Sequence, residues 1–130
     1  MFQPRAFVRC AIVMLSLFTL VAATPAWFHT TLTKSEPAAN DTLAAAPHML
    51  RLWFSERVEL PLTRVKLADA AGQPVPLAPL ARPDTGARAP ILVAITKPVS
   101  AGRYVVSWST AADDGHPAKG TFAFVVKAAR

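Results

Sequence analysis

The sequence predicts an all-β protein built as a single Greek-key sandwich of about seven strands. Three observations lead to this fold class. From residue 30 onward, short runs of alternating apolar and polar residues follow one another, as strands with one buried and one wet face require. Ten of the twelve prolines lie after Trp27 and separate these runs. No stretch keeps the apolar period of a helix.

The strands can be placed in order along the chain. The first is expected just after His29, and the others are expected around residues 50–54, 65–67, 91–95, 104–108 and 122–126. Most of these runs alternate, which indicates one buried face. Residues 91–95 are instead continuously apolar, which fits a strand that is covered on both faces.

The large aromatic residues can be assigned by parity within the strands. Tyr104 and Trp108 share the parity of Val106, so all three are predicted to point into the core. Trp53 has the opposite parity to its apolar neighbours Leu52 and Phe54, so its burial is not predicted.

Turn residues mark the connections between the strands. Residues 69–74 (DAAGQP) predict a turn between two strands, and residues 79–90 (PLARPDTGARAP) predict a longer exposed loop. Residues 100–102 (SAG) lead into the strand around 104–108. Short strands with regular turn signals in about 100 residues are typical of a sandwich.

The first residues have the layout of a secretory signal peptide. Arg5 and Arg9 precede an apolar run over residues 11–23, and small residues follow it. We therefore expect a signal peptide over residues 1–26 and a folded domain over residues 27–130. Cleavage after Ala23, Ala26 or Phe28 and an uncleaved membrane anchor are the alternatives, with Ala26 favoured because its side chain is small.

Charge and cysteine content narrow the function classes. Loss of Arg5 and Arg9 lowers the formal net charge from +6 to +4, and the remaining basic residues are scattered singly. Nucleic-acid binding would need a basic patch or a known motif, so we expect none. The only cysteine, Cys10, lies within the expected signal peptide. A metal site in the domain would then use histidine, carboxylate, methionine or backbone donors.

Three histidines are available for chemistry: His29, His48 and His116. His29 lies near the expected new N-terminus, and His116 lies in the loop between the last two strands. Because the first and last strands of a Greek-key sandwich can lie close together, His29 could approach that loop. His48 follows Pro47 at the start of a strand and is interpreted as a surface residue.

The segment Asp114-Gly115-His116-Pro117 contains a plausible pair of metal ligands. In an extended segment, residues i and i+2 point the same way, so Asp114 and His116 could reach one ion. Gly115 removes bulk between them, and Pro117 restricts His116 to extended conformations. The same residues also form a good turn, so composition leaves both readings open.

Several segments together resemble the CopC family of periplasmic copper-resistance proteins. The family typically opens H-x-x-L-x-x-S-x-P-A, which this chain matches from His29 to Ala38. Residues 50–56 (LRLWFSE), 102–108 (GRYVVSW), 114–117 (DGHP) and 120–122 (GTF) follow in the family's order. The resemblance covers residues 29–126 and implies a cupredoxin-like or immunoglobulin-like sandwich.

The resemblance also implies a copper site. Its ligands for one Cu(II) ion per chain would be His29, Asp114 and His116, with Glu56 as a weak ligand, an acceptor near the site, or an exposed charge beside Arg57. Some members bind Cu(I) through a Met-rich loop. This chain has only three methionines, so no Cu(I) site is expected.

The cleavage position decides which of two coordination geometries is available to His29. Family members commonly have small residues before the first histidine, whereas Trp27 and Phe28 precede His29 here. Cleavage after Phe28 would let His29 bind through both amine and imidazole. Cleavage after Ala26 would place histidine third in the chain, where amine, two amides and imidazole can surround Cu(II) or Ni(II).

The function implied is a periplasmic carrier or buffer of Cu(II) in copper resistance and homeostasis, not an enzyme. A CopD-type inner-membrane protein is the partner that the resemblance implies. Two alternatives stay open at this point. One is a histidine-brace copper oxygenase, which would need an open coordination position and a substrate surface. The other is a metal-free, immunoglobulin-like interaction module.

Overall fold

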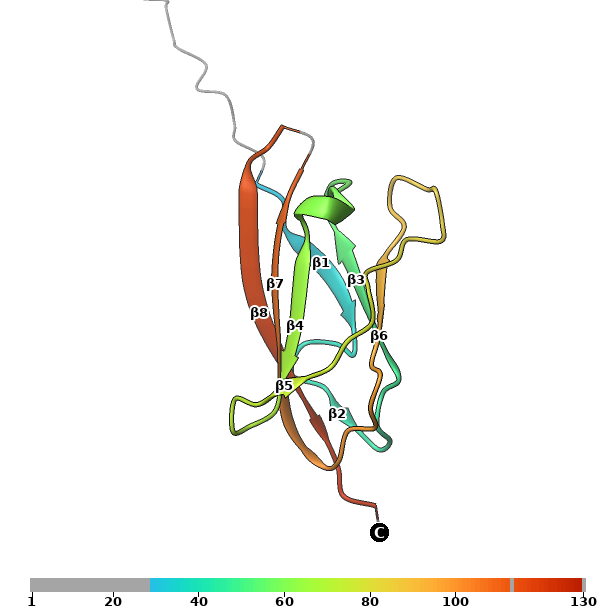
Figure 1. Ribbon diagram of the computed structural model, residues 1–130, viewed down its shortest axis with the longest axis vertical. Coiled ribbons are helices and arrows are strands. Elements are labelled where there is room, and N and C mark those ends of the chain that lie inside the picture. Colours follow the sequence, from blue (N-terminus) through green and yellow to red (C-terminus); the bar gives the residue numbers. More distant parts are fainter. Residues whose placement is uncertain (1–28, 113, 130) are drawn as a thin grey trace, which may run out of the picture.

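The computed structural model describes residues 29–112 and 114–129, which form two β-sheets packed face to face (Figure 1). The smaller sheet has the order β1-β3-β6 and the larger has the order β2-β8-β7-β4-β5. The strands are β1 (Leu32–Glu36), β2 (Thr42–Leu43), β3 (Met49–Phe54), β4 (Arg64–Ala68), β5 (Pro74–Val75), β6 (Ile91–Ala94), β7 (Gly102–Ala111) and β8 (Pro117–Val126). A short 3-10 helix, η1 (Leu60–Leu62), precedes β4.

The predicted all-β sandwich is confirmed, with eight strands in the described residues in place of about seven. The strand that sequence patterning missed is β2, which has only two residues and pairs in parallel with the end of β8. A segment that short has no alternation to detect. Its position depends on distant bonds, such as the N–H of Val125 donating to the carbonyl oxygen of Asp41 at 2.9 Å.

The larger sheet is organised by the hairpin of β7 and β8. The two strands pair over ten residues each, from Gly102 opposite Val126 to Ala111 opposite Pro117. On its other side β7 pairs with β4, from Arg64 opposite Ser109 to Ala68 opposite Val105. The turn over residues 69–73 then leads to β5, as predicted.

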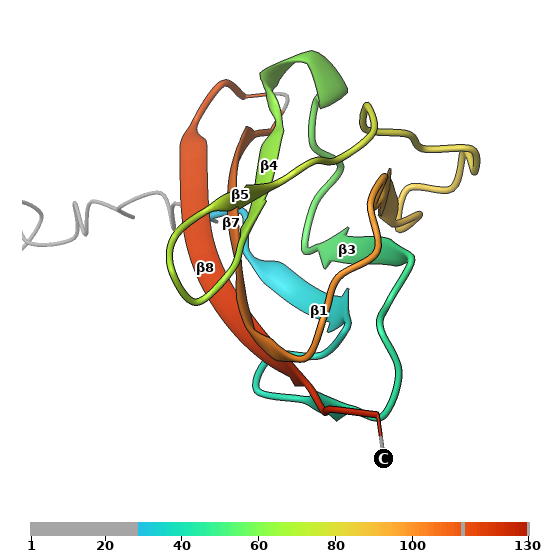
Figure 2. The ribbon, with the colours of Figure 1, turned by 60° about the horizontal axis from the view of Figure 1, so that its bottom comes forward.

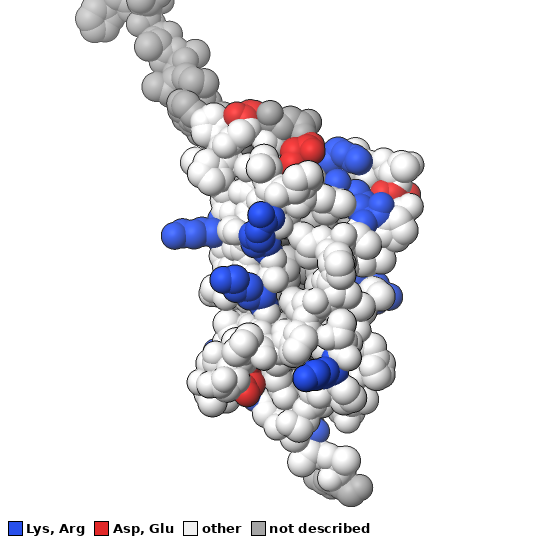
Figure 3. Space-filling model, viewed as in Figure 1, with Lys and Arg blue, Asp and Glu red and all other residues white. Residues whose placement is uncertain are grey.

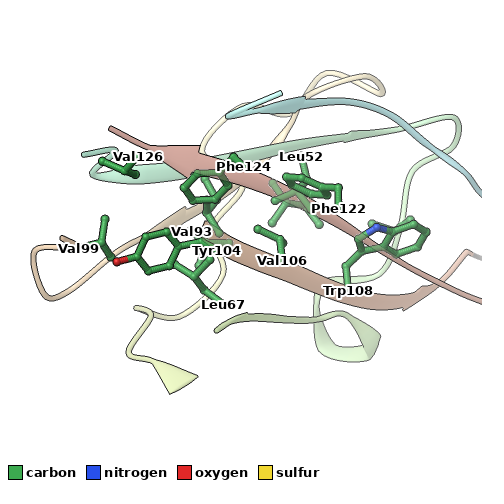
Figure 4. Close-up of a cluster of buried hydrophobic side chains, with 13 residues drawn as sticks. Leu52, Leu67, Val93, Val99, Tyr104, Val106, Trp108, Phe122, Phe124 and Val126 are labelled. Atoms are coloured by element: carbon green, nitrogen blue, oxygen red, sulfur yellow. The ribbon is translucent and has the colours of Figure 1, made fainter. Parts of the chain in front are cut away.

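The core lies between the sheets and is built from the inward parity of their strands (Figure 4). Phe124, Leu50 and Leu52 are completely buried. Tyr104 and Trp108 also lie in the core, as predicted: the ring of Tyr104 stacks on Phe124, and that of Trp108 meets Phe54 edge to face. Burial of apolar surface at this interface is the main source of stability of the fold.

Trp53 lies on the outer face of the smaller sheet, in agreement with its parity. The residue is half-buried, and the ammonium of Lys34 lies over its ring, 4.3 Å from the ring centroid. Lys34 also pairs with Glu36 at 2.8 Å, and Arg51 pairs with the same carboxylate at 3.1 Å. The single carboxylate of Glu36 therefore offsets one of the two positive charges that contact it.

The prediction that residues 91–95 are covered on both faces is wrong. In β6, Ile91 and Val93 are buried, whereas Leu92 and Ala94 are only half-buried. The strand lies at the edge of a three-stranded sheet, so one face meets the core and the other is only partly covered. The segment around Ala81 runs along its free edge, exchanging backbone hydrogen bonds of 2.9 and 2.8 Å with Leu92.

The first and last strands lie in different sheets. β1 belongs to the smaller sheet and β8 to the larger. Figure 2 shows β8, β7 and β4 on one side of the sandwich and β1 and β3 on the other. In Figure 1, however, the start of β1 lies at the same end of the sandwich as the connection between β7 and β8. The topology thus brings the beginning of the described chain to the end of the molecule that carries the DGH segment.

The expected signal peptide and its cleavage positions fall within residues 1–28, outside the described residues. Among the residues that the structure describes, no helix is long and apolar enough to span a membrane.

Candidate metal centre

The connection between β7 and β8, residues 112–116, is here called the tip; within it, Asp113 lies outside the described residues. The tip is a tight turn. The N–H of Gly115 donates to the carbonyl oxygen of Ala112 at 2.8 Å, and Gly115 has a φ of +77°. Side chains with a Cβ rarely adopt this left-handed backbone, so glycine suits the position.

Asp114 and His116 are held together by two contacts within the tip. The Oδ1 atom of Asp114 accepts the backbone N–H of His116 at 3.0 Å, and its Oδ2 atom lies 2.9 Å from Nδ1 of the imidazole. About half of each side chain is exposed (52% for Asp114 and 49% for His116), so both are accessible from solvent. The structure therefore brings this predicted pair together on the surface.

The backbone conformation that brings Asp114 and His116 together differs from the predicted one. The predicted geometry was an extended segment with alternate side chains on one side. The structure instead has a turn in which Asp114 bonds to the backbone two residues ahead, a local pattern that aspartate favours. Gly115, between the two residues, has a left-handed backbone in this turn, so the glycine contributes its backbone freedom as well as its small size.

The contacts with His116 also shift the ionisation of Asp114. The hydrogen bond from the backbone N–H of His116, followed by the contact with its imidazole, lowers the pKa of the Asp114 carboxyl below its usual value. Both interactions favour the ionised form. The carboxylate is therefore negatively charged throughout the neutral and mildly acidic range.

The base of the tip is fixed by neighbours that sequence reasoning did not identify. Val58 forms a bridge with Ala112, and the N–H of Glu59 donates to the carbonyl oxygen of Ala111 at 3.1 Å. Beneath them, the buried hydroxyls of Thr63 and Thr110 lie 2.7 Å apart. These contacts join residues about 50 positions apart in the chain, so no local sequence pattern predicts them.

His29 lies at the same end of the sandwich as the tip. Its side chain is exposed, and the chain is anchored two residues later, where Thr31 and Ser55 are joined by two hydrogen bonds of 2.9 and 2.8 Å. Within residues 29–112 and 114–129, however, no three His, Cys, Asp or Glu side chains are grouped closely enough to hold a metal ion. The structure gathers Asp114 and His116 but does not add His29 to them.

Glu56 and His48 occupy different ends of the molecule. Glu56 follows β3 at the end that carries the tip, is half-buried, and forms no hydrogen bond or ion pair with any described residue. His48 precedes the opposite end of β3 and is exposed, as predicted. At about 3.3 Å per residue, it lies about 20 Å from the strand end where His29 and the tip are found.

The chemistry open to the tip follows from its donor set. An imidazole beside an ionised carboxylate offers one nitrogen and one oxygen donor, which suit borderline divalent ions better than soft monovalent ones. With Nδ1 directed at Asp114, a neutral imidazole carries its acceptor lone pair on Nε2. The pair thus offers two donor atoms of types that metal ions use, and a complete site needs donors from elsewhere.

Comparison with known proteins places this geometry in context. Residues 32–127 match the profile of the CopC domain family. The chain is 32% identical over 114 residues to Protein YobA of Escherichia coli K12, an alignment that covers 87% of this chain and 91% of that protein. It is 31% identical over 128 residues to Copper resistance protein C of Xanthomonas campestris pv. juglandis, covering 94% and 98%.

Solved structures agree with these sequence relationships. The crystal structure of PcoC, a methionine-rich copper resistance protein from Escherichia coli, superposes with a TM-score of 0.67 at 30% identity and covers 76% of this chain and 99% of that one. CopC from Methylosinus trichosporium OB3b has the same fold, with a TM-score of 0.70 at 24% identity, covering 78% and 97%.

Proposed function

The chain belongs to the CopC family, and from that premise we propose that it binds one Cu(II) ion through His29, Asp114 and His116. Relatives named copper resistance protein C support a role in copper resistance for this chain as well. The observation that carries the assignment is the Asp114–His116 pair, held at 2.9 Å on the surface at the end of the sandwich where the described chain begins.

The donor types fit Cu(II). The described residues contain no cysteine and a single methionine, Met49, which is half-buried at the start of β3. Soft thioether donors select Cu(I), whereas imidazole and carboxylate suit Cu(II) in a tetragonal arrangement. The relative PcoC is described as methionine rich, and this chain is not. We therefore propose Cu(II), and not Cu(I), as the ion.

Each member of the pair has a distinct role in this proposal. His116 would bind copper through Nε2, because Nδ1 faces the carboxylate of Asp114. Each carboxylate oxygen has two lone pairs, so Asp114 can keep its contacts with His116 and still accept the metal. Its lowered pKa keeps the carboxylate charged, which adds attraction for a cation. Glu56, at the same end, is proposed as a weak ligand or nearby acceptor.

The third donor, His29, depends on how the N-terminus is processed. A chain that starts at His29 would bind copper through its amine and imidazole together with the tip. A chain that starts at Trp27 would carry a three-residue chelate that uses His29 and competes with the tip for it. N-terminal sequencing of the exported protein distinguishes the two.

We further propose that the protein acts in the periplasm as a carrier or buffer of Cu(II), without catalysis. A CopD-type membrane protein is the proposed recipient. An exposed site at one end of a rigid sandwich suits transfer, because a partner can reach the ion without unfolding the core.

The test compares His116→Ala with His48→Ala by titration with Cu(II) and electron paramagnetic resonance. We expect wild type and His48→Ala to bind one Cu(II) with nitrogen-dominated tetragonal spectra, and His116→Ala to lose most of the affinity. His48→Ala is a matched control, since both histidines are exposed and only one lies in the tip. Equal Cu(II) affinity of wild type, His48→Ala and His116→Ala would show that the tip does not bind the ion. If the chain starts at Trp27, this result would favour the chelate formed by its first three residues.

A second measurement checks the ligand type. Because only neutral imidazole coordinates a metal, affinity should fall as the pH drops below about 6.5, the ordinary pKa of histidine. Affinity that stays constant from about pH 7 to about pH 5 would exclude imidazole ligands. Tighter binding of Cu(I) than of Cu(II) at neutral pH would contradict the proposed ion.

A further inference from the structure

The outer face of the larger sheet carries an ordered set of basic and hydroxyl side chains. In the half of the sheet nearer the tip, two rows run across β4, β7 and β8. The registers give the rows as Arg64–Ser109–Lys119 and Lys66–Ser107–Thr121. We call these six residues the basic face. Their parity is opposite to that of the core residues, so the side chains point outward.

The basic face is hollowed and open. The six side chains, together with Trp108 and Gly120, line a shallow groove of about 510 Å³. No acidic residue is among them. Figure 3 shows basic side chains over β4 and β8 with no acidic side chain between them (Figure 3).

The charges of the basic face are not neutralised from within the described chain. Arg64 donates to the backbone oxygens of Pro61 and Thr63, both at 3.0 Å, and makes no ion pair there. Lys66 and Lys119 make neither a hydrogen bond nor an ion pair with any described residue. Cations gathered without counter-charge produce a positive potential that an anionic partner would neutralise.

We propose that the basic face docks on an anionic phospholipid surface. Its three charges lie on β4 and β8, on either side of β7 and so about 10 Å apart across the sheet, which suits a plane of separate headgroups better than one small anion. The hydroxyls between the charges can donate to phosphate oxygens.

The composition of the whole outer face also favours a lipid surface over a protein partner. Protein interfaces are usually anchored by aromatic side chains, above all tryptophan and tyrosine. Trp108 lines the groove but is only 8% exposed, and Tyr104 is 5% exposed, so neither ring projects from this face as an anchor. Below the basic face the sheet continues with small aliphatic side chains, Val105 and Ala123, which offer no anchor. This docking does not rest on copper binding.

The experiment is co-sedimentation with vesicles. The protein used starts at His29, since residues 29–129 hold both sheets and the whole core, and an apolar leader would itself bind lipid. We expect binding to vesicles of phosphatidylglycerol and phosphatidylcholine, and none to phosphatidylcholine alone. Lys66→Glu/Lys119→Glu should weaken binding at least about tenfold, since each basic residue near an anionic surface contributes about a factor of five.

The matched control is Lys97→Glu/Arg88→Glu, which changes the net charge equally but lies in loops away from the basic face. It should keep most of the binding, and thermal unfolding should show that both variants stay folded. Equal weakening by the two variants would overturn the assignment of the face. Failure of wild type to bind anionic vesicles while it binds polyglutamate would overturn it in favour of an acidic protein partner.

Discussion

The body of the β7–β8 hairpin and its tip are continuous in sequence and differ in almost every physical property. In the body, Val106, Phe122 and Phe124 are buried and ten residue pairs hold the strands together. In the tip, Asp114, Gly115 and His116 are exposed and are held by a few local bonds. Burial of apolar side chains, which has no directional requirement, stabilises the body. Hydrogen bonds, which are directional, fix the geometry of the tip.

The difference indicates that stability and metal binding can be changed separately. A substitution in the body should alter unfolding and leave the tip intact in the folded molecules. Replacement of an exposed ligand side chain in the tip, such as that of His116, should alter metal binding and barely affect unfolding. The predictions below test this separation, beginning with the largest expected effect.

Phe124→Ala should destabilise the body by about 3–5 kcal/mol, because it leaves a cavity at a completely buried position. Urea unfolding measures the change. Val125→Ala is the matched control on the same strand: its side chain points outward and is 37% exposed, so we expect a loss below about 1 kcal/mol. Similar losses for the two variants would show that the burial of Phe124 is not what stabilises the body.

Gly120→Ala should cost about 1–3 kcal/mol through overpacking. A Cβ atom there would lie 2.7 Å from Cζ2 of Trp108, whose ring is confined against Phe54. Gly86→Ala is the control, since its nearest atom would be 3.8 Å away, and we expect little change. Urea unfolding compares the two, and tryptophan fluorescence should report the shift of Trp108. An unchanged midpoint for Gly120→Ala would contradict this packing.

Gly115→Ala should cost about 1–2 kcal/mol because of its left-handed backbone, and it should weaken Cu(II) binding as well. Gly72→Ala provides a close match: Gly72 has a φ of +78°, and neither position has an atom within 4 Å of the added Cβ. The two variants should lose similar stability in thermal unfolding. Only Gly115→Ala should change a Cu(II) titration, and an equal change in both would mean that the tip geometry is irrelevant to binding.

The smallest expected effect is the pH dependence of Asp114. Because its pKa is lowered in the folded protein, its contribution to stability is present above the unfolded value and is lost as the pH falls through the folded value. The contribution is small because the group is exposed. Titration of the carboxyl by nuclear magnetic resonance should give a midpoint below 3.8, and Gly115→Ala should return it toward 3.8. A wild-type midpoint above 3.8 would contradict the contacts with His116.

Much of the fold could be predicted from the sequence because the alternation of apolar residues is local. The parity of Tyr104, Val106 and Trp108 assigned them to the core, and they lie there. The turn over residues 69–73 was visible in its composition for the same reason. By contrast, β2 and the half-covered face of β6 depend on which strands become neighbours. The alternation of apolar and polar residues within one strand does not tell which strands pair with it.

For the candidate site, the donor types and the closeness of Asp114 to His116 could be predicted from the chain alone, since two residues so near in the chain cannot be far apart. The resemblance to the CopC family added His29. The folded protein adds two features that could not be predicted: the pair lies in a turn with a left-handed Gly115, and distant residues such as Val58 hold its base. The fold also brings three cations, two from β4 and one from β8, onto one face. The physical reason is that such contacts join segments far apart in the chain, and they exist only once burial of the common core has brought the strands together.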